Sequence, residues 1–154
     1  MPIQARPIPP RQTHALRHAV LRPHQRLDEM VYDGDDEPGT THFGAFQAED
    51  RQQPIGIVTL SREPMPGDPA ADDARLRGMA VAPAAQGAGV GRLLVQRCID
   101  AAARQGAKRL WCNARVSAMG FYEKLGFVTH GDEFEIVPIG PHFVMSVAVG
   151  GHPR

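Results

Sequence analysis

The chain has 154 residues, 42% of them hydrophobic and 22% charged, and these values fit one globular domain with a single core. Its 17 basic and 17 acidic side chains cancel, whereas a protein that binds nucleic acid or a membrane surface usually carries a basic excess. We therefore expect neither nucleic acid nor a membrane among its partners.

The cysteines and the N-terminus indicate a reducing compartment. Cys98 and Cys112 are too few for a disulfide framework, and both lie in apolar patterns, so we expect buried thiols. No apolar run is long enough to span a bilayer, and the first residues lack the charged and apolar regions of a signal peptide. These features predict a cytoplasmic protein.

The first forty residues predict one edge strand, one helix and one loop. Residues 3–8 have a strand pattern that prolines restrict to the edge of a sheet. Thr13 is predicted to cap a helix whose apolar residues recur at helical spacing, and Pro23 ends it. Residues 33–40 are polar and contain glycine and proline, which is typical of a loop.

A hairpin and a long loop follow. Alternation of apolar and polar residues predicts strands over residues 41–47 and 54–60, joined by a turn around residues 48–51. Residues 61–74 are rich in proline, glycine, aspartate and alanine, which is typical of a long surface loop. We expect this loop to be a flap that faces the substrate.

The middle of the chain has its most regular pattern. Residues 75–81 predict a strand, and a glycine-rich turn follows it at residues 86–91. An amphipathic helix is then predicted from about Gly89 to Arg104, and Gly106 ends it. The apolar stripe expected on this helix consists of Val90, Leu93, Leu94, Cys98, Ala101 and Ala102.

The last third predicts a strand, a short helix and a final group of strands. The strand covers residues 108–114, and the helix covers residues 117–125. Further strands are expected over residues 127–130, 133–137 and 143–149, and residues 147–154 are expected to form a loose C-terminal tail. This order of elements predicts a mixed sheet with helices on its faces.

The turn at residues 86–91 (Gln-Gly-Ala-Gly-Val-Gly) is the strongest sign of a ligand. Glycines let the backbone approach a ligand, and the positive end of the following helix dipole attracts an anion, so the turn predicts a main-chain phosphate site. Its spacing differs from the dinucleotide fingerprint, and no Gly-Lys-Ser/Thr follows. Both facts disfavour a dinucleotide-binding oxidoreductase or a nucleoside-triphosphate site. A tight turn without a ligand is the structural alternative.

Three segments of the second half occur in a characteristic order. The first joins residues 76–83 to the turn at 86–91, the second is the helix at 117–127 with its Phe-Tyr pair and terminal Gly-Phe, and the third is the Pro-His-x-x-Met run at 141–145. Together they resemble the GNAT superfamily of acyl-CoA-dependent N-acyltransferases. The resemblance covers about residues 75–146.

The resemblance implies a fold and a donor. The implied fold is α/β (α+β), a single N-acetyltransferase domain over residues 1–154 with a mixed, mostly antiparallel twisted sheet, helices on both faces and a central splayed strand pair. The implied donor is acetyl-CoA, used as a cosubstrate without a metal. The residues implied in binding it are Met79, Ala80, Val81, Gln86, Gly87, Ala88, Gly89, Val90, Gly91, Arg92, Asn113 and Tyr122.

The resemblance also implies catalytic roles. Tyr122 would protonate the departing thiolate as a general acid, since its hydroxyl is expected at the edge of the cleft when Ala118, Phe121 and Leu125 face the core. The base that takes the proton of the amine would be Glu133, Glu135 or His142. A structural alternative exists for each residue. Tyr122 can serve packing alone, His142 can hydrogen-bond the backbone, the two glutamates can be exposed strand residues, and Asn113 can cap the following helix.

The expected function is therefore transfer of an acetyl group from acetyl-CoA to a primary amine by direct attack in a ternary complex. A non-catalytic acyl-CoA-binding sensor or regulatory module is the alternative. The acceptor is expected to be a small-molecule or peptide amine, and a homodimer through the C-terminal strands is compatible with the pattern. His14 and His18 have the spacing of a metal-binding pair, but no third ligand is near them in sequence, so we expect no metal.

Overall fold

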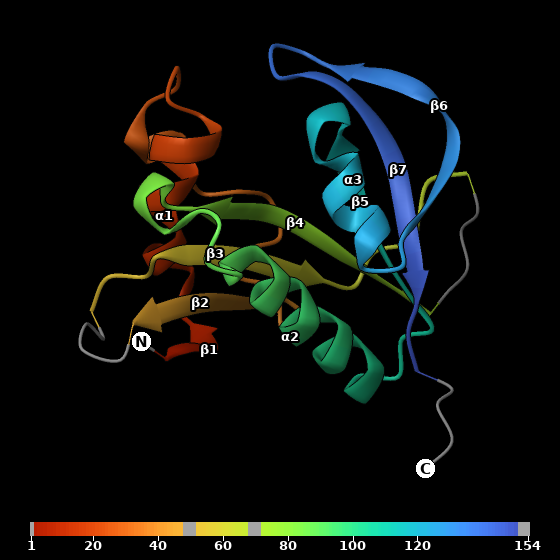
Figure 1. Cartoon of the computed structure of the whole chain (residues 1–154), viewed down its shortest axis with the longest axis horizontal. Coiled ribbons are helices and arrows are strands. Elements are labelled where there is room, and N and C mark those ends of the chain that lie inside the picture. Colours follow the sequence, from red (N-terminus) through yellow and green to blue (C-terminus); the bar gives the residue numbers. More distant parts are fainter. Residues whose placement is uncertain (1, 48–51, 68–71, 151–154) are drawn as a thin grey trace. The chain divides into compact units, whose positions relative to one another are not determined.

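The computed structural model describes residues 2–47, 52–67 and 72–150. They form two compact units (Figure 1). The first unit comprises Met1–Arg62 and Leu76–Ile99, and the second comprises Glu63–Arg75 and Asp100–Arg154. Among the described residues, no helix is long and apolar enough to cross a membrane.

Seven strands pair in the order β1-β2-β3-β4 in the first unit and β4-β5-β7-β6 in the second, because β4 contributes residues to both. Four of the pairings are antiparallel, and the pair β4–β5 is parallel. The strands are β1 (Ile3–Ile8), β2 (Thr41–Gln47), β3 (Gly56–Ser61), β4 (Asp73–Val81), β5 (Arg109–Arg115), β6 (Val128–Ile136) and β7 (Gly140–Ala148). The mixed, mostly antiparallel sheet predicted from the sequence is thereby confirmed.

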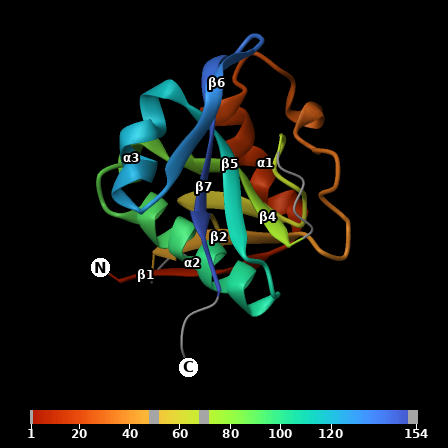
Figure 2. The same cartoon turned by 90° about the vertical axis from the view of Figure 1, so that its right-hand side faces the viewer.

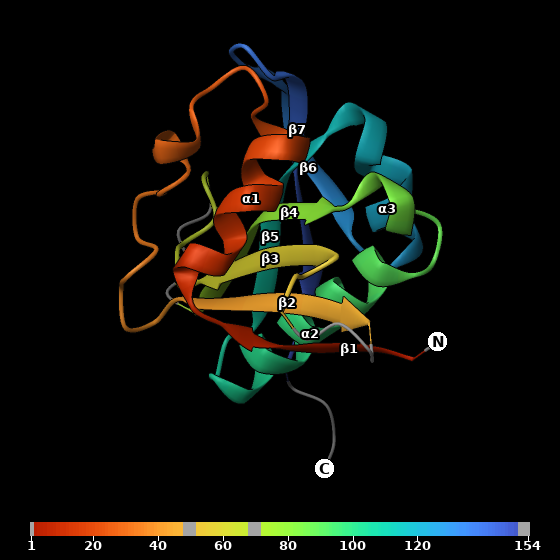
Figure 3. The ribbon, with the colours of Figure 1, turned by 90° about the vertical axis from the view of Figure 1, so that its left-hand side faces the viewer.

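Helices cover both faces of the strands in the first unit. Figures 1 and 3 show α1 (His14–Leu16) and α2 (Val90–Arg104) on opposite sides of β2 and β3. On the α2 side, Gly56 leaves room for Val90 and Leu94, since a Cβ atom there would lie 2.6 Å and 3.0 Å from their side chains. On the α1 side the core consists of Ile8, Phe46, Ile57 and Ala80, with Leu16, Val20 and Leu21 packed against it.

The first helical segment begins earlier than the sequence pattern indicated. A 3-10 turn, η1 (Pro10–Thr13), leads into α1, and a π-helical turn, η2 (Arg17–Leu21), follows. Thr13 stands at the N-cap position of α1, but its side chain caps no N–H there, because its buried hydroxyl donates to the carbonyl oxygen of Pro10 at 2.7 Å. Pro10 occupies the first turn instead, where its missing N–H costs nothing.

The predicted hairpin strands are confirmed. β2 covers the predicted residues, and β3 begins two residues later and ends one residue later than predicted. The register runs antiparallel from Thr41↔Leu60 to Ala45↔Gly56. The turn expected at residues 48–51 lies outside the described residues. Between η2 and β2, where every residue is described, only the short 3-10 turn η3 (Leu27–Glu29) is helical.

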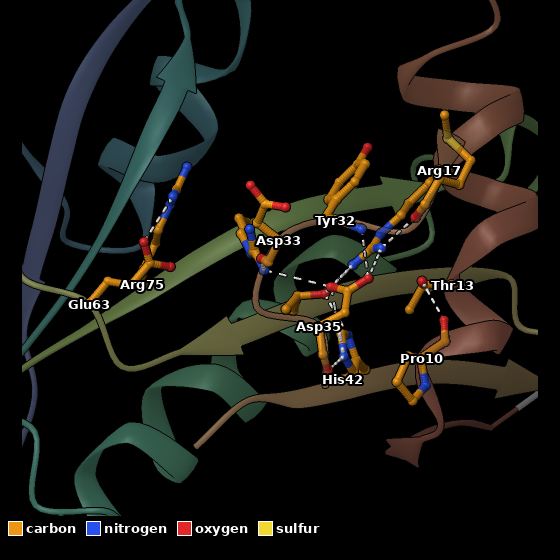
Figure 4. Close-up of polar contacts among 12 residues, drawn as sticks. Pro10, Thr13, Arg17, Tyr32, Asp33, Asp35, His42, Glu63 and Arg75 are labelled. Carbon is orange, nitrogen blue, oxygen red and sulfur yellow. Dashed lines mark hydrogen bonds and ion pairs between the residues drawn. The ribbon is translucent and has the colours of Figure 1, made fainter. Parts of the chain in front are cut away.

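A buried ion pair organises that connection in the first unit (Figure 4). Asp35, in the loop predicted at residues 33–40, is 3% exposed and binds Arg17, which is fully buried. Arg17 Nη1 and Nη2 donate to the two Asp35 carboxylate oxygens at 2.6 Å and 3.0 Å. Arg17 also donates to the carbonyl oxygen of Met30 at 2.8 Å and to Thr59 Oγ1 at 2.9 Å.

His42 closes the same network. Its Nε2 lies 3.0 Å from the Asp35 carbonyl oxygen, which only accepts, so Nε2–H is the donor. In that tautomer Nδ1 accepts from the Thr59 hydroxyl at 2.8 Å. The polar loop thus holds one buried carboxylate, and its burial was not predicted from the sequence.

The second unit contains the remaining strands, with β7 between β5 and β6 (Figure 2). Pairing of β4 with β5 covers only Asp73↔Arg109 to Arg75↔Trp111, although β5 continues to Arg115. Two strands can splay only if their pairing stops before the strands end, and the pairing of β4 with β5 does so. The helices are η5 (Val116–Ala118) and α3 (Met119–Lys124), which Gly126 ends with a φ of 95°.

Two expectations for the second unit need correction. The strands expected at 127–130 and 133–137 form one strand, β6, whose register shifts between His130 and Phe134. The tail expected from residue 147 begins later, because β7 pairs through Ala148 and the N–H of Val149 donates to the Lys108 carbonyl oxygen at 2.8 Å. Residues 151–154 lie outside the described residues.

The loop expected at residues 61–74 is partly fixed. Met65 and Asp73 are buried, and the Met65 N–H donates to Asp73 Oδ2 at 2.8 Å. Arg109 donates to both oxygens of the same carboxylate, at 2.9 Å and 2.8 Å. Trp111 Nε1 donates to the Glu63 carbonyl oxygen at 2.8 Å. These contacts hold both ends of the segment. Residues 68–71, the middle of the expected flap, lie outside the described residues.

Replacing Asp35 with asparagine should destabilise the protein. The variant leaves the Arg17 charge buried without a carboxylate, which typically costs about 3–5 kcal/mol. Burial raises the pKa of Asp35, but hydrogen bonds from Arg17 and the Tyr32 N–H together with nearby charges lower it below its ordinary value of 3.8. The contribution is therefore present above pH 3.8 and is lost as the pH falls through the lower folded-state pKa.

Urea denaturation at pH 7 measures the free energy of unfolding of Asp35→Asn and of the matched control Asp36→Asn, whose parent side chain is exposed. The control should match the wild type. An Asp35→Asn protein as stable as the control at pH 7 would show that the ion pair is dispensable.

Candidate functional site

The turn between β4 and α2 has the geometry that a main-chain anion site needs. After β4 ends at Val81, the short turn η4 (Pro83–Ala85) leads to Gln86, and α2 begins at Val90. Gly87 and Gly89 have φ values of 86° and 82°, in the left-handed region that favours glycine. A Cβ atom at either position would meet nothing within 4 Å. The glycines are therefore required by backbone conformation and not by crowding.

The loop is open to solvent at the positive end of a helix. Residues 86–89 are exposed, whereas Val90 is 1% exposed and anchors the first turn of α2. N–H groups in a first helical turn have no intrahelical acceptor, and they point out of the helix end. Arg92 is exposed in that turn. Gln86 braces the loop, because its side-chain amide donates to the Val81 carbonyl oxygen at 3.3 Å.

β4 leads into this loop with an irregular backbone. Gly78 has a φ of 62°, although it lies within the strand. Beyond it, Met79 and Val81 are half-buried and Ala80 is 3% exposed. The N–H of Ala82 donates to the Ile55 carbonyl oxygen at 2.8 Å, which fixes the end of the strand in the first unit. The implied cofactor residues from Met79 to Arg92 thus belong to one strand-turn-helix segment.

Tyr122, in the second unit, is more deeply placed than expected. The sequence pattern put its hydroxyl at the edge of a cleft, with Ala118, Phe121 and Leu125 facing the core. The structure buries Tyr122 instead, at 6% exposure, and leaves those three residues half-buried. Its ring packs between Phe121 and Phe127, with both centroid distances 5.1 Å. The aromatic contacts on both sides account for the difference.

Cys112 on β5 is the neighbour of Tyr122. Burial raises the pKa of the Cys112 thiol to about 12, and a hydrogen bond with the Tyr122 side chain and the charge of Arg75 oppose that rise. The Tyr122 hydroxyl therefore reaches the apolar interior at β5. Arg75 itself pairs with Glu63 at 3.2 Å, and its guanidinium lies 5.0 Å from the centroid of the Trp111 ring.

Asn113 follows Cys112 on β5 and pairs with Val144 of β7. Its Oδ1 atom is buried and has no hydrogen-bond partner among the described residues. The capping alternative is wrong, since Arg115 occupies the position before η5 and no side chain caps that turn. A buried amide oxygen without a partner is costly unless a ligand or water donates to it.

The three candidate bases differ in their surroundings. Glu133 and Glu135 are exposed on β6. His142 on β7 is 4% exposed, and its Nδ1–H donates to the Gly140 carbonyl oxygen at 2.7 Å. In the neutral ring this bond leaves the lone pair on Nε2. The Phe134 ring lies beside the imidazole, with the centroids 5.9 Å apart. The backbone hydrogen bond expected as the alternative for His142 is present, and it is compatible with a role as base.

Sequence reasoning missed Arg17, Tyr32 and Asp35. The available signal was an arginine on the apolar side of the first helix, one residue after Leu16 and three before Val20. A charge at such a position requires a buried partner of opposite sign, and the segment after the helix supplies it. No group of three or more histidine, cysteine, aspartate or glutamate side chains in the described ranges is arranged to hold a metal ion.

Comparisons with known proteins agree with this geometry. The model of the acetyltransferase (GNAT) family matches residues 10–127, which includes parts of both units. The protein is 34% identical over 143 residues to YitI of Bacillus subtilis (strain 168), named as an uncharacterized N-acetyltransferase, and the match covers 93% of this chain and 94% of YitI. The chain belongs to the acetyltransferase (GNAT) family.

Solved structures share the fold. A chain of the NatC complex bound to Gag peptide and CoA has a TM-score of 0.77 at 19% identity, covering 97% of this chain and 99% of that one. A spermidine N-acetyltransferase SpeG chimera from Vibrio cholerae and hSSAT has a TM-score of 0.71 at 21% identity, covering 95% of each chain. At these identities the comparison establishes the fold alone. The first name mentions a peptide and CoA, and the second mentions spermidine.

Both cysteines should be unreactive in the native protein. Cys98 and Cys112 are buried and free, and burial raises the pKa of each thiol. Because the thiolate is the reactive form, an aromatic disulfide reagent at pH 8 should react slowly with the native protein and rapidly with both thiols in guanidinium chloride. Rapid reaction of either thiol without denaturant would contradict the burial.

Proposed function

We propose that this chain transfers an acetyl group from acetyl-CoA to a primary amine by direct attack in a ternary complex. The observation that carries the proposal is the open glycine loop that joins β4 to the N-terminus of α2. The conformation at Gly87 and Gly89 frees main-chain N–H groups toward an exposed surface, which suits the pyrophosphate of CoA. When bound, acetyl-CoA supplies the activated acetyl group as a thioester.

The chain's own groups would bind and orient this donor. Main-chain N–H groups from Gly87 to Gly91 would hold the pyrophosphate, with Arg92 nearby as a cation and Gln86 supporting the loop. Main-chain groups of Met79 to Val81 would bind the pantetheine arm and stabilise negative charge on the reacting carbonyl oxygen. The buried, unpartnered Oδ1 of Asn113 would accept a hydrogen bond from the same arm.

Proton transfer would involve two groups of the second unit. Tyr122 would donate the proton that the leaving thiolate takes up, from a hydroxyl held in an apolar environment. His142 is the preferred base, because its Nδ1–H bond to Gly140 leaves Nε2 to accept the proton of the amine, directly or through water. Glu133 and Glu135 remain candidates with exposed carboxylates. The acceptor is proposed to be a small-molecule or peptide amine.

The glycine loop can be tested with a matched pair of variants. Gly89→Ala and Gly106→Ala each place a Cβ atom at a left-handed φ, 82° and 87°, where it meets nothing within 4 Å. Both should lose about 1–2 kcal/mol of stability from backbone strain. Only Gly89→Ala should also weaken acetyl-CoA binding, by about tenfold through lost main-chain hydrogen bonds. Calorimetric titration measures the affinity, and equal affinities in the two variants would count against a pyrophosphate site.

Tyr122→Phe tests the general acid. The variant keeps the ring packing against Phe121 and Phe127 and removes only the hydroxyl. The value of kcat should fall by about 100-fold, within the usual range for general acid catalysis, with little change in acetyl-CoA affinity. Thiol release and calorimetry provide the two measurements. Unchanged turnover would remove Tyr122 from the chemistry and leave the donor site intact.

A further inference from the structure

The general acid proposed above, Tyr122, has a cysteine as its hydrogen-bonding neighbour within the second unit. α3, which carries Tyr122, contacts β5, which carries Cys112. Both side chains are buried, and the Tyr122 hydroxyl and the Cys112 thiol are hydrogen-bonded to each other. The state of this thiol therefore bears on what the hydroxyl can do.

The Tyr122 ring has little freedom to move. Phe121 and Phe127 pack against it from two sides. The Tyr122 carbonyl oxygen accepts from the N–H groups of Leu125 and Phe127 at 3.0 Å and 3.1 Å, which fixes the backbone at the end of α3. With backbone and ring held, the freedom that remains is rotation of the O–H bond. The direction of that bond decides whether Tyr122 can give its proton to a leaving thiolate.

Cys112 occupies the position on β5 where this strand leaves β4. The pairing with β4 ends at Trp111, whereas Cys112 pairs with Met145 of β7 and so stays fixed in the sheet. The next residue is Asn113, whose buried Oδ1 is proposed to bind the pantetheine arm. The thiol thus belongs to the part of β5 that contributes to the proposed donor site.

The thiol keeps its hydrogen at neutral pH. Burial raises the pKa of the Cys112 thiol to about 12, so S–H is the form present. A hydroxyl oxygen has two lone pairs, whereas a thiol sulfur is only a weak acceptor. A bond from the Cys112 S–H to the Tyr122 oxygen leaves the hydroxyl hydrogen for another acceptor, and the reverse bond would direct that hydrogen to Cys112.

We propose that Cys112 positions Tyr122 for acid catalysis, because its S–H donates to the Tyr122 oxygen and turns the O–H bond toward the leaving sulfur of CoA. This inference rests on the acetyl transfer proposed above. In the step itself, the Tyr122 O–H bond breaks and its proton joins the sulfur while the bond between sulfur and the acetyl carbon breaks. The products are CoA thiol and a tyrosinate. The Cys112 S–H stabilises the tyrosinate until it takes a proton from solvent.

Two substitutions at position 112 differ by a single hydroxyl group and test the donor. The value of kcat, measured by CoA thiol release, should fall about fivefold in Cys112→Ala, the usual effect of one hydrogen bond between neutral groups. It should stay near the wild-type value in Cys112→Ser, which keeps a donor. Acetyl-CoA affinity should be unchanged in both. Equal kcat values in the two variants would exclude a donor role.

A second pair of variants separates positioning from packing. Cys98→Ala removes the other buried thiol and should leave kcat unchanged. In a Tyr122→Phe background, Cys112→Ala should cause no further loss of kcat, because the thiol then has no hydroxyl to orient. A loss of the same size with and without the hydroxyl would show that Cys112 acts through packing alone, and the proposal would fail.

Raman spectroscopy of the S–H stretch tests the contact without turnover. In Cys98→Ala protein, Cys112 provides the one remaining thiol. Its stretch should lie at a lower wavenumber there than in Cys98→Ala/Tyr122→Phe protein, because donation weakens the S–H bond. Equal wavenumbers would overturn the proposal even where acetyl transfer occurs. If no amine is acetylated, the proposed function fails, and the band still decides whether Cys112 donates to Tyr122.

Discussion

The buried guanidinium of Arg17 constrains much of the first unit. An arginine stays charged in the interior, so its donors must be matched by acceptors brought in from other segments. Met30 and Asp35 come from the connection between η2 and β2, and Thr59 comes from β3. This connection has few apolar residues and one short 3-10 turn, so the hydrophobic effect alone holds it weakly. The ion pair supplies the attachment that its composition lacks.

The Arg17–Asp35 ion pair also fixes the position of Tyr32. The Asp35 carboxylate accepts from the Tyr32 N–H as well as from Arg17, so the backbone of Tyr32 is fixed to the network. The Tyr32 ring then lies on the guanidinium and next to Gly78 in β4. The ion pair therefore holds Tyr32 beside Gly78, the residue before the strand segment proposed to bind the donor, and loss of Asp35 would release it.

The donor and acceptor sides of the site use different parts of the chain. The proposed pyrophosphate loop depends on backbone conformation at Gly87 and Gly89, and N–H groups recognise any phosphate of suitable shape. Side chains would have to choose the acceptor, because main-chain groups are the same in every member of a fold.

The strands and the long helix were predictable where one face is buried. β2 has the predicted bounds, and α2 has its apolar residues at helical spacing, with Val90, Leu94 and Cys98 buried. Local patterns failed where another contact decides, either within a turn or between distant segments. Thr13 satisfies the carbonyl of Pro10 and caps nothing, and Asp35 is buried inside a segment that reads as a polar loop.

Tyr122 shows the same limit within the site. Helical spacing put Phe121 inside and Tyr122 at the edge, but packing against Phe121 and Phe127 buries Tyr122. The glycine loop was predicted because its conformation requires glycine at particular positions in sequence. The contact of Gly78 with Tyr32 and Arg17 was not, because those residues lie 46 and 61 positions away in the sequence.

The most direct test of the central claim is the release of CoA thiol from acetyl-CoA in the presence of single amines of differing charge, with the amine product identified by mass. The account predicts release that requires both protein and amine, together with an acetylated amine in equal amount. Thermal stabilisation by acetyl-CoA without thiol release for any amine would contradict it, and would identify the chain as an acyl-CoA-binding module.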